Sequence, residues 1–246
     1  MQRMDLARQY ATSANLAARI ELHQRFSTNP YGLQRWVFDR LQLAPGMRVL
    51  EIACGAGSLW RENLDRMPRG VELVLSDFSL GMVQATRTIV SDAAFVTCAL
   101  PSLPFASARF DLVIANHMLY HVEARQEALA EIRRVLRRGG ALFATTNGAD
   151  HLREIKELMR ELGGRDDVSA AFTLENAEEQ LRRVFGTIER DEYADSLRVT
   201  DADALVRYLA SVTPRAEEVR SCIEQRIAGD GAFHVKKSTG SFIARN

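Results

Sequence analysis

The residues best suited to chemistry follow two apolar runs in the first half of the chain. The segment Val49–Trp60, VLEIACGAGSLW, places Glu51 before a turn of small residues, and LVLSDFS ends a second apolar run in Asp77. Carboxylates accept hydrogen bonds at both oxygens, so they suit the hydroxyl or ammonium groups of a ligand. Gly55 and Gly57 would let the backbone approach that ligand closely because they carry no Cβ. This pattern predicts a binding site for a polar small molecule.

Two nucleotide-binding patterns contain a turn similar to this small-residue turn. The dinucleotide pattern G-x-G-x-x-G, counted from Gly55, requires a third small residue where Trp60 stands, and counted from Ala53 it ends at Ser58. A phosphate-binding P-loop is excluded because no Gly-Lys-Ser/Thr follows the turn. An NAD(P) oxidoreductase is therefore the least favoured of the functions that we consider.

The elements that must position these residues alternate between strand and helix. We expect strands at 48–53, 71–76, 94–98, 110–115 and 140–146, and helices from about Ser58, at 79–91 and at 123–138. Apolar strands such as LVLS and DLVIAN indicate a sheet buried on both faces, and the alternation with helices indicates parallel pairing. With two later strands, this predicts an α/β fold: a doubly wound, mostly parallel, seven-stranded, Rossmann-like sheet. Such sheets bind ligands at the carboxyl ends of their strands.

The remaining segments predict helices around this sheet. We expect an N-terminal helical arm or lid at 1–43, and an α/β domain at 44–246 with helical cap elements at about 148–185 and 200–230. TIERDEYADSLRV and AFHVKKSTGSFIAR each read as one late strand. The arm and the caps either cover the ligand crevice or pack against the sheet. Tyr10, Tyr31 and Trp36 either line a substrate pocket or belong to the core.

Composition narrows the choice of partner. The 32 Lys and Arg residues balance 32 Asp and Glu residues, so no overall field attracts nucleic acid or anionic lipid. No run approaches the ~18 apolar residues of a membrane span, and the first residues lack the apolar region of a signal peptide. Cys54, Cys98 and Cys222 have no metal-ligand spacing. We expect a cytoplasmic protein with no metal, nucleic acid or membrane partner.

Four ordered segments resemble one known family, the class I S-adenosylmethionine-dependent methyltransferases of the small-molecule type. They are LEIACGAGSLW, LVLSDFS, LPSLPFASARFDLVIANHMLYHV and ALAEIRRVLRRGGALFATT, and the resemblance covers about residues 46–147. It implies S-adenosyl-L-methionine as cofactor and methyl transfer to a small-molecule acceptor, with an aromatic compound of specialised metabolism as one option. The alternative is an S-adenosylmethionine-binding protein with another role, such as a cyclase or an accessory subunit.

The resemblance also implies roles for individual residues. Asp77 would accept hydrogen bonds from both ribose hydroxyls, and Phe78 would pack beside the adenine. The loop Ala53–Gly57, which contains Cys54, would lie along the methionine moiety, and Glu51 would help to position its ammonium group. Asn116 would face the amino-acid end and the transferable methyl group.

Two positions depart from the family pattern. Ala53 stands where the family has the first glycine of its loop. Ala99 stands where the family often has an acid that binds the adenine amino group, which leaves the Leu100 amide as a partner for the ring. These departures concern cofactor affinity and leave the fold prediction unchanged.

His117 and His121, in NHMLYHV, are the candidates for acid–base chemistry. A sulfonium methyl group is already electrophilic, so a general base is needed only when the acceptor must lose a proton during attack. The two histidines act either as that base or as positioning residues. We favour the second interpretation because no acid in the motif is placed to orient either imidazole.

Overall fold

The computed structural model describes residues 13–163 and 168–245, which fold into two compact units. Of the described residues, 31–149, 168–193 and 239–245 form the sheet unit, and 13–30, 150–163 and 194–238 form the helical unit. Each unit is therefore built from three separate stretches of sequence.

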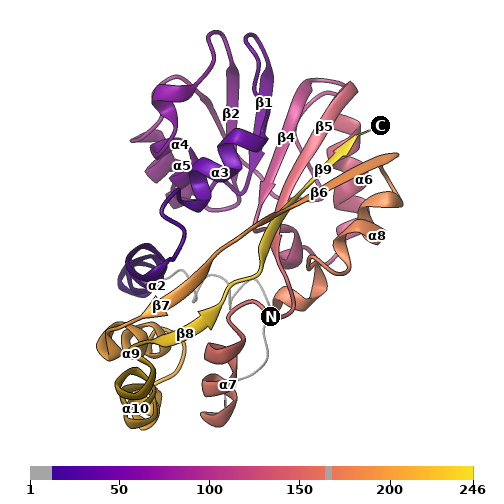
Figure 1. The fold of residues 1–246 in the computed structure, drawn as a ribbon. Coiled ribbons are helices and arrows are strands. Elements are labelled where there is room, and N and C mark those ends of the chain that lie inside the picture. Colours follow the sequence, from indigo (N-terminus) through magenta and orange to yellow (C-terminus); the bar gives the residue numbers. More distant parts are fainter. Residues whose placement is uncertain (1–12, 164–167, 246) are drawn as a thin grey trace. The chain divides into compact units, whose positions relative to one another are not determined.

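The sheet unit is built on seven strands in the order β3-β2-β1-β4-β5-β9-β6 (Figure 1). Strands β1 to β5 pair in parallel, and only β9 runs antiparallel to its neighbours. The strands are β1 (Arg48–Ile52), β2 (Glu72–Asp77), β3 (Ala94–Thr97), β4 (Phe110–Asn116), β5 (Leu136–Asn147), β6 (Thr187–Tyr193) and β9 (Thr239–Arg245). The predicted doubly wound, mostly parallel, seven-stranded sheet is confirmed.

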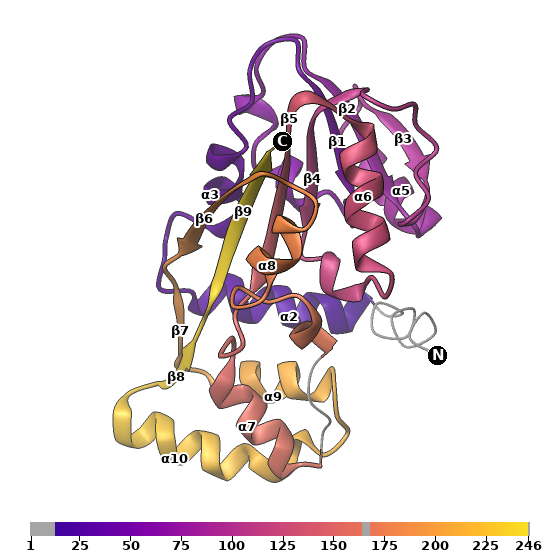
Figure 2. The same ribbon diagram turned by 90° about the vertical axis from the view of Figure 1, so that its right-hand side faces the viewer.

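Helices cover both faces of this sheet. The helices of the unit are α3 (Leu33–Arg40), α4 (Ser58–Arg61), α5 (Leu80–Arg87), α6 (Arg125–Val135) and α8 (Ala177–Arg182), with short turns η1 (Leu64–Arg66), η2 (Leu119–His121) and η3 (Val168–Ala171). Figure 2 shows α6 running along one face. Successive strand residues point to opposite faces, so an apolar strand such as β4 contributes side chains to a core on each face of the sheet.

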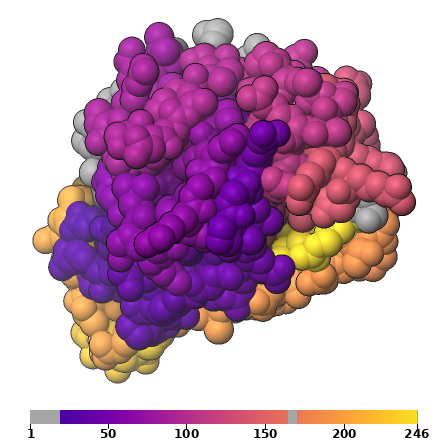
Figure 3. Space-filling model, turned by 90° about the horizontal axis from the view of Figure 1, so that it is seen from above, coloured from indigo at the N-terminus to yellow at the C-terminus, as the bar shows by residue number. Residues whose placement is uncertain are grey.

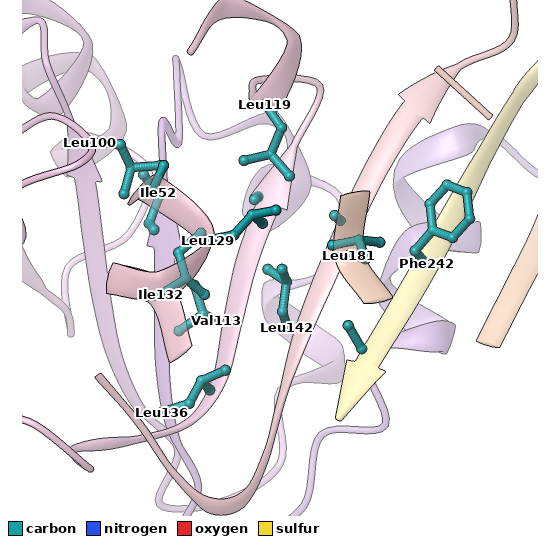
Figure 4. Close-up of a cluster of buried hydrophobic side chains, with 14 of the residues drawn as sticks. Ile52, Leu100, Val113, Leu119, Leu129, Ile132, Leu136, Leu142, Leu181 and Phe242 are labelled. Carbon is teal, nitrogen blue, oxygen red and sulfur yellow. The ribbon is translucent and has the colours of Figure 1, made fainter. Parts of the chain in front are cut away.

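One core lies beneath α6 and α8, and Figure 4 shows its side chains. Val113 of β4 and Leu142 of β5 pack there against Leu129 and Ile132 of α6 and against Leu181 of α8. The second core, on the opposite face, joins strand residues such as Val49 and Ile114 to α3 and α4. Burial on both faces explains why the parallel strands could be predicted from apolar runs alone.

The parallel strands begin at one edge of the sheet and end at the opposite edge. Figure 3 views the edge at which the parallel strands begin, where yellow atoms of β9 lie beside salmon atoms of β5. This agrees with the pairing of Ala141 with Arg245. The carboxyl ends of the parallel strands lie at the other edge, which is where ligands bind in folds of this kind.

The helical unit has its own core around a two-stranded sheet of β7 (Ser196–Val199) and β8 (Phe233–Lys236). Its helices are α2 (Ser13–Phe26), α7 (Arg153–Glu161), α9 (Ala202–Ala210) and α10 (Arg220–Asp230), with the turn η4 (Ala216–Val219). Leu22 and Phe26 of α2 are buried with Leu205 and Leu209 of α9. The described part of the N-terminal arm is thus an integral part of this core.

Two predicted segments contribute to both units. From the predicted arm 1–43, α2 belongs to the helical unit and α3 to the sheet unit, and from the predicted cap 148–185, α7 belongs to the helical unit and α8 to the sheet unit. Each predicted late strand is two strands, β6 with β7 and β8 with β9. The break after β6 contains Asp195, whose buried carboxylate pairs with Lys237 within the helical unit.

Candidate functional site

Three predicted cofactor residues gather at the edge of the sheet where the parallel strands end. Glu51 lies on β1, Asp77 ends β2 and Asn116 ends β4. The register aligns Glu51 with Ile114 on one side and Ile52 with Ser76 on the other, so the three strand ends are neighbours. The topology alone therefore brings two acids and an amide together.

Asp77 connects the end of β2 to the loop that follows β1. Its Oδ2 accepts the Gly55 backbone N–H at 3.0 Å, and its Oδ1 accepts the Ser79 N–H at 2.9 Å. Burial raises the pKa of this carboxyl group, and the backbone amides of Ser79, Gly55 and Phe78 oppose that rise. A carboxylate offers about four lone-pair sites, so both oxygens can accept further hydrogen bonds.

Large apolar side chains are exposed directly after Asp77. Phe78 is 52% exposed and Leu80, at the start of α5, is 59% exposed. Exposed residues of this size beside a buried acid suit a ligand with a flat apolar part and a hydroxylated part. The adenine and ribose roles of Phe78 and Asp77 stay predictions.

The loop between β1 and α4 is held in a left-handed conformation. Ala53, Gly55 and Gly57 have φ angles of 57°, 56° and 73°. This region is costly for alanine, so its use at Ala53 stores strain beside the site. The Thr86 hydroxyl donates to the Gly55 carbonyl at 2.7 Å. Gly57 occupies the N-cap of α4 without a side-chain hydrogen bond.

Cys54 is buried within the loop. Its Sγ lies 3.7 Å from the Thr86 hydroxyl oxygen, and burial raises the pKa of the thiol to about 12. A thiol that stays protonated at neutral pH is a poor nucleophile. Cys54 therefore shapes the loop and does not supply covalent chemistry.

Glu51 is a buried acid held by two neutral groups. It is only 3% exposed. Trp60 Nε1 donates to Glu51 Oε2 at 2.6 Å, and Asn116 Nδ2 donates to Oε1 at 3.3 Å. Burial raises the pKa of Glu51 to about 7, the two donors lower it, and the charge of Asp77 raises it further. A carboxylate in this setting favours a cationic ligand group.

The hydrogen bonds of Asn116 continue to the loop after β4. Thr145 Oγ1 donates to Asn116 Oδ1 at 3.2 Å and accepts the His117 backbone N–H at 3.1 Å. His117 has a φ angle of 48°, so a non-glycine residue in the loop after β4 is left-handed, as Ala53 is in the loop after β1. The His121 ring lies 4.4 Å from that of Tyr120. The structure places both histidines near Asn116 in sequence and in the fold, and their catalytic role stays a prediction.

Of the two positions that depart from the family pattern, Ala53 lies in the loop after β1 and Ala99 lies after β3. Ala99 forms a bridge with Ser102 and is half-buried. The Leu100 side chain is buried in the core beneath α6. The Leu100 amide as a partner of an adenine ring stays a prediction.

The three aromatic residues predicted either to line a substrate pocket or to belong to the core lie in different surroundings. Tyr10 lies outside the described residues. The exposed Tyr31 donates its hydroxyl to Asp39 at 2.6 Å. Trp36 is buried, with its ring 5.4 Å from that of Tyr193 and beneath the Arg40 guanidinium. Core packing, the other interpretation of these residues, describes Trp36.

Sequence reasoning missed three residues that shape this site: Trp60, Thr86 and Thr145. Only Trp60 carried a signal, because a bulky residue occupied the position where a dinucleotide-binding loop needs a small one. Its hydrogen bond to Glu51 depends on how α4 packs against the sheet, and the spacing of residues in the sequence does not specify that packing.

In residues 13–163 and 168–245, no group of three or more His, Cys, Asp or Glu residues is arranged to hold a metal ion. No helix in those same ranges combines the length and the apolar character that crossing a bilayer requires.

Comparisons with known proteins show that part of the sheet unit is similar to methyltransferases. A family model described as a methyltransferase domain matches residues 50–144. A malonyl-[acyl-carrier protein] O-methyltransferase from Enterobacter lignolyticus is 32% identical over 162 residues, covering 64% of this chain and 60% of that protein. A demethylmenaquinone methyltransferase from Renibacterium salmoninarum is 37% identical over 109 residues, covering 44% of this chain and 45% of that protein. This chain thus spans 60% or less of the length of these curated relatives.

A solved structure extends the likeness to the fold. The Haemonchus contortus phosphoethanolamine N-methyltransferase 2, in complex with phosphomonomethylethanolamine and S-adenosylhomocysteine, matches with a TM-score of 0.63. The match covers 100% of this chain and 60% of that chain, at 18% identity. At this level of identity the likeness establishes a shared fold.

Proposed function

We propose that this chain, whose residues 50–144 match a methyltransferase-domain family model, is a class I S-adenosylmethionine-dependent methyltransferase that transfers a methyl group from S-adenosyl-L-methionine to a small molecule. The observation that carries the proposal is the contact of Asp77 with Gly55. It joins a buried carboxylate, the small-residue loop and the exposed Phe78 into one surface at the ends of β1 and β2.

The residues at this edge fit the cofactor. Asp77 keeps acceptor capacity for ribose hydroxyls after binding two backbone amides. Phe78 offers an apolar face for the adenine, and the loop Ala53–Gly57 offers close backbone approach to the methionine moiety. Glu51, buried between neutral donors, suits the ammonium group. Acid, apolar face and loop are therefore complementary to three parts of one ligand.

When bound, S-adenosyl-L-methionine supplies an electrophilic methyl group, which leaves positioning and water exclusion to the protein. Holding two reactants in line contributes about 7–11 kcal/mol to lowering a barrier. The left-handed residues Ala53 and His117 mark the two loops whose backbone is most constrained at this edge. Such constraint suits a site that must fix the geometry of its ligands.

The chemical class of the methyl acceptor is also part of the proposal. By their names, the two relatives act on malonyl-[acyl-carrier protein] and on demethylmenaquinone. We infer a small-molecule acceptor and favour an aromatic one of specialised metabolism, because Tyr120 and His121 place ring systems beside the end of β4. A cytoplasmic setting is supported by the free thiols of Cys54, Cys98 and Cys222.

One experiment separates this function from the alternatives. The protein is incubated with methyl-labelled S-adenosyl-L-methionine and phenolic, quinol, amine and carboxylic acceptors, and labelled product and S-adenosylhomocysteine are measured by mass spectrometry. Methyl transfer to one acceptor class, lost in Asp77→Ala, supports the proposal. Tight cofactor binding without transfer to any class would favour a cyclase or accessory role, and binding of NAD(H) instead would favour an oxidoreductase.

A further inference from the structure

The Trp60 indole connects the apolar core to the buried Glu51 carboxylate. Trp60 is fully buried on α4, and its N–H points at Glu51 Oε2 at 2.6 Å. Its ring packs edge-on against Phe38 of α3, with the ring centres 6.5 Å apart. The indole is thus fixed by the core on one side and ends in a single polar contact on the other.

That contact discriminates between the two protonation states of Glu51. An indole N–H can only donate a hydrogen bond, and the Asn116 Nδ2 group also donates. Both partners therefore stabilise the carboxylate and offer nothing to a carboxylic acid proton. Burial acts in the opposite direction and raises the pKa of Glu51 to about 7. The protonation state near neutral pH thus depends on these two donors.

The charged and titratable neighbours of Glu51 do not replace them. Asp77, on the neighbouring β2, repels the Glu51 charge and raises its pKa. The Cys54 thiol, in the loop after β1, is itself raised to a pKa of about 12 by burial and by Glu51. Neither group favours an ionised Glu51.

We propose that Trp60 is a positioning residue that holds the Glu51 carboxylate ionised and oriented toward a cationic ligand group. The identity of that group as the ammonium of S-adenosyl-L-methionine rests on the proposed function. Loss of the indole N–H then shifts ligand binding to higher pH, because Glu51 keeps its proton further into the neutral range.

The first test uses the apo protein and needs no ligand. The chain has two tryptophans, so Trp36→Phe leaves Trp60 as the single reporter. Its fluorescence should change with a midpoint near pH 7, the value set by Glu51. The additional substitution Glu51→Gln should remove this transition. A transition that persists without Glu51, or none near neutral pH, would overturn the proposal.

The second test measures S-adenosylhomocysteine affinity by calorimetry between pH 6 and 8.5. Trp60→Phe removes the donor together with part of the ring volume. The missing donor should lower affinity tenfold or more at pH 7 with recovery as pH rises, whereas the missing volume lowers affinity equally at every pH. The matched control Phe38→Leu disturbs the packing of the indole and keeps its N–H, so its loss should be similar at every pH. Protonation of the ligand itself affects the affinity of every variant equally, so it cancels when the variants are compared at one pH.

These outcomes separate the inference from the function on which it rests. An equal loss at every pH in Trp60→Phe would show a structural role alone and contradict the proposal. If the unmodified protein binds no S-adenosylhomocysteine, the proposed function fails, while the fluorescence titration still decides whether Trp60 senses Glu51.

Discussion

Asp77 accepts the Gly55 backbone N–H at 3.0 Å, so the end of β2 fixes the loop that follows β1. The carbonyl of the same Gly55 accepts the Thr86 hydroxyl at 2.7 Å. One residue of the loop is therefore held through both of its backbone polar groups by side chains of β2 and α5. This clamp explains how a loop of small residues keeps a left-handed path.

Gly57→Ala tests the steric side of this clamp. An added Cβ would lie 3.0 Å from Thr86 Cγ2, at a φ angle of 73°. Gly46→Ala is the matched control, because Gly46 has a φ angle of 77° and nothing within 4 Å of the added Cβ. We expect Gly57→Ala to lower the free energy of unfolding by about 1–3 kcal/mol more than the control does, measured by urea denaturation. Thr86→Ser should restore part of that difference, and equal losses in the two alanine variants would contradict the clamp.

Glu51→Gln should change how stability depends on pH. The pKa of Glu51 rises from 4.5 in the unfolded chain to about 7 in the folded protein. Between these values the folded state holds a proton that the unfolded state has lost, so stability falls as pH rises through this window. Glutamine removes the effect. The free energy of unfolding of the variant, relative to that of the unmodified protein, should therefore increase by about 3 kcal/mol between pH 4.5 and pH 7.

Denaturant unfolding at pH 5 and pH 8 measures this difference. Glu72→Gln, an exposed carboxyl group on β2, is the control for surface charge. Parallel pH profiles for Glu51→Gln and the unmodified protein would show that Glu51 ionises as an exposed acid does.

Leu22→Ala tests the part of the helical unit contributed by α2. Leu22 is fully buried in the core of that unit, whereas Ile20 on the same helix is 42% exposed. A buried Leu→Ala change typically costs 2–5 kcal/mol, and Ile20→Ala should cost about 0.5 kcal/mol or less. Thermal unfolding of both variants measures the difference.

The same pair of variants addresses the prediction that the N-terminal arm acts as a lid. If it does, Leu22→Ala should lower kcat while leaving the affinity for S-adenosylhomocysteine unchanged, and Ile20→Ala should change neither. Full turnover in a destabilised Leu22→Ala protein would refute the lid.

How far the sequence predicts the structure differs between the two units. The strands of the sheet unit lie close to their predicted positions, because strands buried on both faces are continuous apolar runs, as in Phe110–Asn116. The division of TIERDEYADSLRV into β6 and β7 was not predictable, since it contains no glycine or proline. Asp195, at that division, accepts hydrogen bonds from Ser27 and Thr28, partners that are distant in sequence.

The candidate site shows the same contrast. Asp77 and the loop glycines were identified because strand ends and small residues form a local pattern. The partner of Glu51 was missed because Trp60 reaches it across the core, and Trp36 was ambiguous because an amphipathic helix does not reveal what its apolar face contacts.

His117→Gln and His121→Gln test proton removal. If the acceptor is a hydroxyl and one histidine is the base, that variant should lose ~10²–10⁴ in kcat. We expect the smaller effect of altered packing, because a sulfonium methyl group is already electrophilic and an amine or carbon acceptor can lose its proton after the attack. Steady-state kinetics against pH would measure this, and a hundredfold loss with cofactor affinity intact would reverse our expectation.

The most direct test of the central claim is calorimetry of S-adenosylhomocysteine and NADH with the unmodified protein, Asp77→Ala and Asp92→Ala. Asp92 is an exposed acid of the same unit and serves as the matched control. We predict S-adenosylhomocysteine binding that Asp77→Ala weakens by about 1.5–3 kcal/mol, the range for hydrogen bonds to a charged group, and that Asp92→Ala leaves unchanged. NADH should not bind. Unchanged affinity in Asp77→Ala, or binding of NADH in place of S-adenosylhomocysteine, would contradict the account.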